Sequence, residues 1–185
     1  MSFLKKTRLR LGEYFLKKQS QGTSRELKAI NLKQAKSVGV IFDAGKKEDR
    51  KIISDFLRPL ADRGVKYSIL GYIPDIKDQN DYISDQTYTF FSVKECDWLF
   101  RPITEEINHF IGQKFDILLF FAEKDYFPLK WVLRLSSAKF KAGAEGYYHE
   151  DLDFMINTEI TSTAQLLKEI DHYLGDLQVA ENQMA

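Results

Sequence analysis

Apolar residues along this chain fall either in short unbroken runs or in stretches with helical spacing. Residues 38–42 and 115–122 are almost wholly apolar, which is typical of strands that are buried on both faces of a sheet. Residues 48–63 instead carry apolar side chains three and four positions apart, which predicts an amphipathic helix. Another apolar run at residues 65–70 follows this helix, and a strand, a helix and a strand in that order predict a right-handed parallel crossover.

The alternation continues toward the C-terminus. Further strands are predicted at residues 88–93, 140–142 and 154–156. Helices are predicted from Pro102 to residue 111, before Gly112, and over residues 127–137. This order predicts an α/β fold: a Rossmann-like, doubly wound, mostly parallel sheet of five or six strands.

The last predicted helix begins after a cap at Thr161 or Ser162. Its apolar side chains recur with helical spacing and are expected to face the core. They are Leu166, Leu167, Ile170, Tyr173 and Leu174.

Charge is distributed unevenly along the chain. The whole chain has 27 basic and 27 acidic residues, but residues 1–36 hold ten Lys or Arg and only two Glu. This segment therefore carries about +8 and the remainder about −8, an asymmetry that points to a basic arm contacting a polyanion. Two other readings stay open: the arm packs on the acidic body, or it is a solvated helix face.

The same asymmetry suggests that the chain has three parts. Residues 1–36 are a basic helical N-terminal arm with a polar hinge at residues 19–24, residues 37–178 are the Rossmann-like domain, and residues 179–185 are a polar tail. In the second half of the arm, Leu27 and Ile30 are expected to pack, while the strand and helix core begins at Val38. Since no apolar run of signal-peptide length follows the first lysines, a cytoplasmic location is expected.

Several classes of site have no support in the sequence. One cysteine, Cys96, allows neither an internal disulfide framework nor a Cys-rich zinc site. The three histidines are far apart, and no glycine-rich phosphate motif or nucleophile motif is present. We therefore predict no catalytic residue, no cofactor and no metal site.

Small-molecule ligands of open parallel sheets bind beyond the carboxyl ends of the strands. The turn after the first predicted strand could hold an anion at a helix N-terminus, and a glycine-containing loop follows the strand at 140–142. The candidate ligand-binding residues in these two turns are Asp43, Gly45, Lys46, Lys47, Gly143 and Glu145. In the alternative reading, Gly45 makes a tight turn, the lysines are solvated and the second loop is only flexible.

Two segments resemble a known family. The run Phe-Asp-Ile-Leu-Leu-Phe-Phe at residues 115–121, followed by a predicted helix and Ala-Lys-Phe-Lys-Ala-Gly at residues 138–143, resembles the N-terminal Rossmann-like domain of heptosyltransferase-like glycosyltransferases. The resemblance implies a Rossmann-like fold. In those enzymes a second, C-terminal domain holds the donor nucleotide, and this chain matches no donor-binding or catalytic-base motif. Taken whole, the chain resembles an uncharacterised family of small Bacteroidota proteins.

The leading functional hypothesis is a non-catalytic module whose arm contacts RNA on a ribosome or another ribonucleoprotein. The residues expected to contact RNA or a partner are Lys5, Lys6, Arg8, Arg10, Lys17, Lys18, Arg25 and Lys28. One alternative is an enzyme of nucleotide or nucleotide-sugar chemistry, a glycosyltransferase-like half that binds a nucleotide at the strand ends. Another is a peripheral membrane protein whose first helix lies on anionic lipid.

Overall fold

The computed structural model describes residues 3–22, 24–75, 77, 82–156 and 162–177. In this part of the chain six parallel strands form one sheet, in the order β3-β2-β1-β4-β5-β6. The strands are β1 (Ser37–Asp43), β2 (Lys66–Ile73), β3 (Tyr88–Ser92), β4 (Ile117–Phe121), β5 (Phe140–Ala144) and β6 (Phe154–Ile156). The predicted Rossmann-like α/β fold is confirmed.

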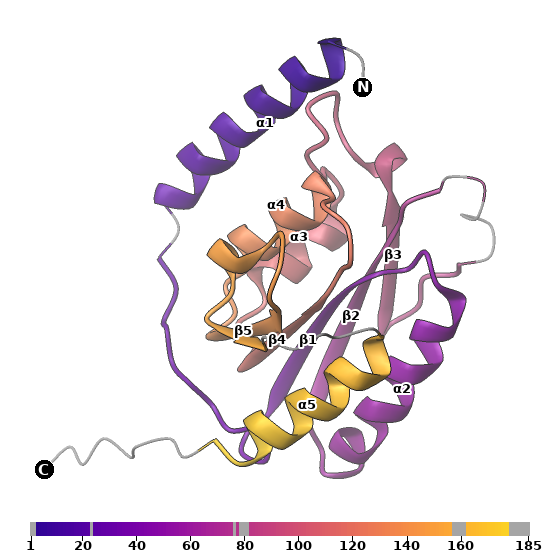
Figure 1. Cartoon of the computed structure of the whole chain (residues 1–185), viewed down its shortest axis with the longest axis vertical. Coiled ribbons are helices and arrows are strands. Elements are labelled where there is room, and N and C mark those ends of the chain that lie inside the picture. Colours follow the sequence, from indigo (N-terminus) through magenta and orange to yellow (C-terminus); the bar gives the residue numbers. More distant parts are fainter. Residues whose placement is uncertain (1–2, 23, 76, 78–81, 157–161, 178–185) are drawn as a thin grey trace, which may run out of the picture.

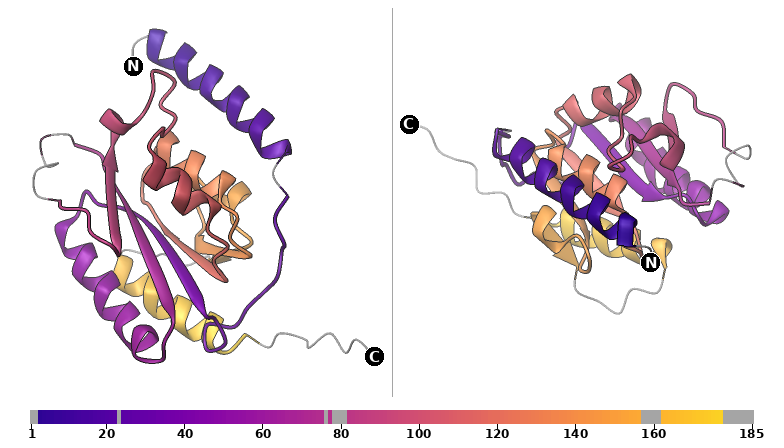
Figure 2. Two further views of the ribbon diagram at one scale, coloured as in Figure 1. Left: turned by 180° about the vertical axis from the view of Figure 1, so that it is seen from behind. Right: turned by 90° about the horizontal axis from the view of Figure 1, so that it is seen from above.

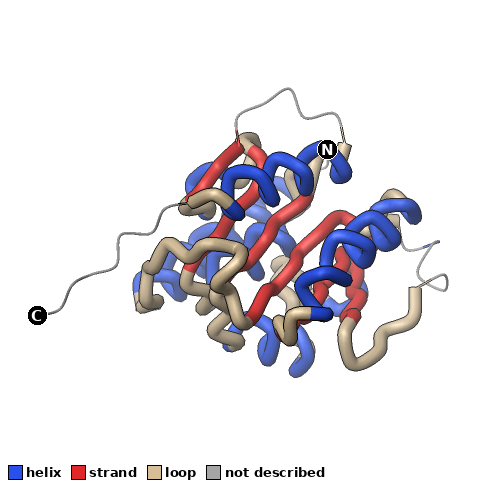
Figure 3. The backbone as a smooth tube through the Cα atoms, turned by 90° about the horizontal axis from the view of Figure 1, so that it is seen from below, coloured by secondary structure: helices blue, strands red, loops and turns tan. Residues whose placement is uncertain are grey.

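Helices cover both faces of the sheet (Figure 1, Figure 3). On one face lie α2 (Lys47–Asp62) and α5 (Thr163–Gly175), and on the other lie α3 (Glu105–Gly112) and α4 (Phe127–Leu135). Side chains of β1 alternate between the two layers, because successive residues of a strand point to opposite faces. Val40 and Phe42 pack with α2 and α5, whereas Ile41 packs with α3 and α4.

The first helix, α1 (Phe3–Gln21), adds a fourth layer outside α4 (Figure 2). Its Leu16 is buried against Phe127, Trp131 and Leu135 of α4. Gly12 permits this close approach: a Cβ at that position would lie 2.8 Å from the carbonyl oxygen of Leu99 and 2.9 Å from Phe127 Cε1. The basic arm is therefore docked on the body by an apolar contact.

The second half of the arm is not helical; residues 24–31 have no regular secondary structure. Leu27, expected to pack, is exposed, whereas Ile30 packs at the edge of the core. Leu32 is buried, and its amide donates to the carbonyl oxygen of Leu174 at 2.9 Å. Asn31 Nδ2 donates to the carbonyl oxygens of Gly175, the last residue of α5, and of Leu177, so this segment is bonded to the end of the last helix.

Two further local predictions are wrong. Pro102 does not begin a helix: it pairs with Cys96 in an antiparallel bridge, and α3 begins at Glu105 after Thr104. Tyr173 is 46% exposed rather than in the core, and its ring contacts Phe154 and His172 at the surface.

Other local predictions are confirmed. Ser162 caps α5 by accepting a hydrogen bond from the amide of Gln165, while Thr161 lies outside the described residues. The other four apolar residues predicted for the core face of α5 are buried.

Candidate functional site

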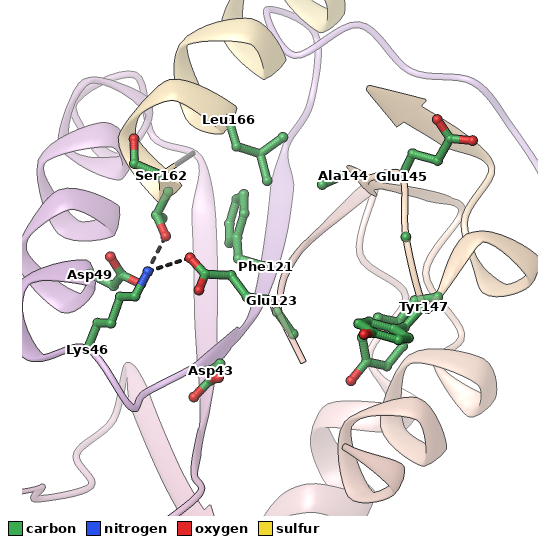
Figure 4. Close-up of a pocket in the computed structure, with 14 residues that line it drawn as sticks. Asp43, Lys46, Asp49, Phe121, Glu123, Ala144, Glu145, Tyr147, Ser162 and Leu166 are labelled. Carbon is green, nitrogen blue, oxygen red and sulfur yellow. Dashed lines mark hydrogen bonds and ion pairs between the residues drawn. The ribbon is translucent and has the colours of Figure 1, made fainter. Parts of the chain in front are cut away.

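A cavity of about 300 Å³ lies at the point where the strand order reverses, beyond the carboxyl ends of β1 and β4. This is the position at which open α/β sheets bind ligands, and the volume is at the small end for a ligand pocket. The ends of β1, β4 and β5 and the first turns of α2 and α5 line it (Figure 4). Of the described residues lining the cavity, four are acidic and Lys46 alone is basic.

Lys46 precedes the first turn of α2 and forms an ion pair with Glu123, which follows β4 (Figure 4). Hydrogen bonding to Glu123 is the main reason that the pKa of Lys46 is raised. Both side chains are about half exposed, so the pair lies at the mouth of the cavity and water screens it. The lysine that could have attracted a phosphate is thus already neutralised.

Asp49 lies in the first turn of α2 and is only 8% exposed. The hydroxyl of Thr163, the first residue of α5, donates to Asp49 Oδ2 at 2.9 Å. Burial raises the pKa of Asp49, while the Thr163 hydrogen bond and the charge of Lys46 oppose that rise. Helix N-termini attract anions, so a carboxylate in the first turn of α2 is stabilised there and adds negative charge to the side of the cavity that a phosphate would approach.

Asp43 ends β1, and its Oδ1 accepts a hydrogen bond from the amide of Gly45 at 2.8 Å. Burial raises the pKa of Asp43; the Gly45 amide, the charge of Lys124 and a hydrogen bond with Tyr126 act in the opposite direction. Burial, with the negative charge of Asp43, also raises the pKa of Tyr126 to about 12. The site therefore holds two carboxyl groups, Asp43 and Asp49, that are easier to protonate than ordinary aspartates.

Tyr148 also lines the cavity. It is only 3% exposed, and its hydroxyl accepts from the amide of Tyr126 at 2.8 Å and donates to the carbonyl oxygen of Lys124 at 2.7 Å. These bonds fix the loop after β4 against the loop after β5. The neighbouring Tyr147 is 64% exposed and offers an aromatic ring at the edge of the cavity (Figure 4).

The structure brings together three of the six residues predicted for ligand binding: Asp43, Lys46 and Glu145 line the cavity. Gly45 forms the turn beside Asp43, and Lys47 begins α2 without lining the cavity.

Gly143 lies inside β5, where a Cβ would be 2.7 Å from the carbonyl oxygen of Phe120 in β4. This close approach gives Gly143 a packing role between the two strands.

The residues predicted for ligand binding do not include Asp49, Ser162 or Thr163, which also line the cavity. Glu123 lines it too; because it directly follows the most apolar predicted strand, the sequence already places it at a strand end where ligands bind. Asp49 and Thr163 are 114 positions apart, and only the fold brings them together.

Other chemistry is limited among the described residues. No group of three or more His, Cys, Asp or Glu side chains there could hold a metal ion. Burial raises the pKa of Cys96 to about 12, with Glu95 and Asp97 adding to the shift, as their positions in the sequence predict. This thiol is therefore a poor nucleophile. Within the described residues, no helix combines the length and apolar character needed to cross a membrane.

The eight basic residues predicted to contact RNA fall into two groups. Arg8 donates to the carbonyl oxygen of Trp98 and lies 4.2 Å from the centre of the Phe100 ring. Arg25 donates to the carbonyl oxygens of Ala138 and Lys139 and pairs with Asp153, so both arginines contact the body. The side chains of the other group are exposed: Lys5, Lys6, Arg10, Lys17, Lys18 and Lys28. Their RNA partner stays a prediction.

Comparison with known protein families assigns this chain to one of them. A model described as "Family of unknown function (DUF6913)" matches residues 8–177. The chain belongs to this family. The matched range begins within α1 and ends beyond α5, so it includes both the docked arm and the whole sheet. No curated protein and no solved structure matches the chain significantly.

Proposed function

We propose that this member of the DUF6913 family binds a small, unphosphorylated polar ligand in the cavity between β1 and β4. The proposal rests on the position of that cavity. It lies where the strand order reverses, and three strand ends and two helix starts converge on it. Parallel sheets of this order hold their ligands there.

The charge of the lining favours one class of ligand. An ionised carboxylate only accepts hydrogen bonds and has several acceptor sites, so Asp43, and Glu123 beside its bond to Lys46, fit groups that donate, namely hydroxyls and amines. A phosphate would meet the like charges of the lining, including that of Asp49 in the first turn of α2. The cavity therefore suits a sugar, a nucleoside or an amino sugar better than a nucleotide.

Aromatic and apolar side chains supply the rest of the surface. The exposed ring of Tyr147 can stack on a flat base or on the apolar face of a sugar, and Phe121 and Leu166 line the same cavity. The two partly buried aspartates would fix the orientation of the ligand, because each carboxylate prefers a donor in a defined direction.

The test uses matched compounds in a titration followed by NMR of the backbone amides. Adenosine and glucosamine are each compared with the corresponding phosphate ester. We expect one of the unphosphorylated compounds to shift amides around Asp43, Glu123 and Tyr147, and its phosphate ester to bind at least tenfold more weakly. Asp43→Asn should reduce the affinity, and Asp55→Asn, an exposed carboxylate on α2, should not. Tighter binding of the esters, or amide shifts confined to other surfaces, would contradict the proposal.

A further inference from the structure

The outermost helix, α1, has two apolar faces rather than one. Its inner face carries Leu9, Gly12 and Leu16, which pack toward α4 and the loop before α3. With 100° between successive helical residues, a second group of apolar side chains points in nearly the opposite direction. This outer face of α1 consists of Phe3, Leu4, Leu11 and Tyr14, with Thr7 and Lys18 among them, while Phe15 lies at its border and contacts Arg101 of the body.

The outer face is open to solvent in the described structure. Phe3 is 82% exposed, Leu4 71% and Tyr14 62%. Scattered exposed apolar residues are ordinary, but four on one side of one helix form a patch, which marks an interaction surface. Trp98, beside Arg8 in the adjoining loop, is also exposed and extends the patch.

Positive charge borders this patch. Lys6, Arg10 and Lys17 follow one edge of the outer face, and all three are exposed. Over its whole length α1 holds six basic residues and one acidic residue, Glu13. The partner of this surface must therefore accept apolar side chains and carry negative charge.

We propose that the outer face of α1 binds the surface of an anionic lipid membrane, with the helix lying in the plane of the interface. The 19 residues of α1 are about 28 Å long, at 1.5 Å per residue. Phe3, Leu4 and Leu11 would enter the boundary of the acyl chains, while the neighbouring lysines and Arg10 meet lipid phosphates. Tyr14 and Trp98 suit the same zone, because their rings have an apolar body and a polar edge.

Two other possible partners, RNA and a second copy of the chain, fit the outer face of α1 less well. RNA would use the basic edge but would leave Leu4 and Leu11 in water, since these side chains neither stack nor donate hydrogen bonds. A second copy of the chain would cover the apolar patch but would bring two strongly basic helices together. Charge complementarity thus favours an anionic lipid surface.

The experiment sediments the full-length protein with vesicles of phosphatidylcholine, alone or mixed with phosphatidylglycerol. We expect binding to the mixed vesicles that weakens as salt is raised, and little binding to phosphatidylcholine alone. The triple variant Lys6→Gln, Arg10→Gln, Lys17→Gln should bind about fivefold more weakly for each charge removed. The double variant Leu4→Ser, Leu11→Ser should bind roughly tenfold more weakly or worse.

A matched control removes three exposed basic residues of α2 and the turn after it, on the opposite face of the sheet: Lys51→Gln, Arg58→Gln, Arg63→Gln. This variant has the same net charge as the first triple variant, and its vesicle binding should equal that of the unmodified chain. Because every substituted side chain is exposed, thermal melting should confirm that all variants are folded.

Four results would overturn the proposal. They are equal binding to neutral vesicles, equal loss in the control variant, binding to RNA without binding to vesicles, and self-association that Leu11→Ser abolishes. If no unphosphorylated compound binds the cavity, the meaning of these four results does not change, since the cavity and the outer face of α1 are different surfaces.

Discussion

The two faces of the sheet are covered in different ways. On one face, α2 and α5 are the outermost layer, and each buries one side against the strands. On the other face, α4 packs on the strands and is itself covered by α1. Seven of the nine residues of α4 are buried, because it has two apolar faces: one packs on the strands and the other on α1, while Lys130 and Arg134 share the remaining side. By contrast, α2 buries a single face. A helix with apolar side chains on two faces thus signals a further layer outside it.

The largest change in stability should come from truncating the N-terminal arm, and it should depend on where the arm is cut. Removing residues 1–36 deletes Leu32 and Ala35 from the core beside α5, and with them the hydrogen bond from Leu32 to Leu174. Removing only residues 1–22 deletes α1 and uncovers α4 but keeps these core residues. The longer truncation should be less stable than the shorter by about 2–5 kcal/mol, measured by urea unfolding.

Equal stability of the two truncated chains would show that the segment after α1 contributes nothing to the core. The domain boundary expected near Lys36 would then describe the folding unit correctly.

A smaller loss of stability is expected from Gly12→Ala in α1. On an exposed helix surface this substitution stabilises by about 1 kcal/mol, because alanine has the higher helix propensity. Here the new Cβ would meet the Leu99 carbonyl and the Phe127 ring, so we expect a net loss of about 1–3 kcal/mol. Hydrogen exchange should show lower protection in α1 and unchanged protection in β1 and β4.

Thr7→Ala is the matched control for Gly12→Ala, since Thr7 is exposed on the same helix. It should keep or slightly raise the protection of α1. If Gly12→Ala behaves in the same way, the close approach of α1 to α4 is not what holds the layer in place.

The smallest effect should be a dependence of stability on pH through Lys141. This lysine is 2% exposed, and its Nζ donates to the carbonyl oxygens of Leu133 and Arg134 at the end of α4. Burial lowers its pKa to about 8, with the nearby charge of Arg25 adding to the shift. Between pH 8 and the ordinary lysine pKa of 10.5 the unfolded chain binds more protons, so stability should rise with pH.

Comparison with Lys141→Met isolates this contribution, because several buried tyrosines with raised pKa values act in the opposite direction above about pH 10. Melting temperatures between pH 8 and 9.5 should rise more, or fall less, in the unmodified chain than in the variant. Parallel curves would contradict the prediction, because they would mean that burial does not lower the pKa of Lys141 and that the buried lysine stays charged over this range.

The sequence predicts the fold well because the strands are buried on both faces. The runs that became β1 and β4 are apolar at every position or nearly so, a pattern that no amphipathic helix gives. The strand order is harder to predict: nothing in the sequence says that the chain crosses from β3 back past β1 to form β4. That crossover creates the cavity, so only its strand-end residues, such as Asp43 and Glu145, could be chosen in advance.

The arm was predictable in charge but not in packing. The ten basic residues in residues 1–36 are evident in the sequence, yet Arg8 and Arg25 look no different there from Arg10. The structure separates them, since the first two bond to carbonyl oxygens of the body and Arg10 is exposed. Leu9 and Leu11 are likewise equivalent in sequence, but they face opposite sides of α1, with Leu9 packed inward.

The carboxylate of Asp49 beside the starts of α2 and α5 has a consequence for how this site could change over evolution. Rossmann-like sites that hold phosphate leave the helix N-terminus free for the ligand. Here the carboxylate of Asp49, bonded to the Thr163 hydroxyl, lies between the first turns of two helices. Replacing Asp49 with glycine would remove one of the four acidic side chains of the lining, so a single substitution would shift this cavity toward accepting an anion.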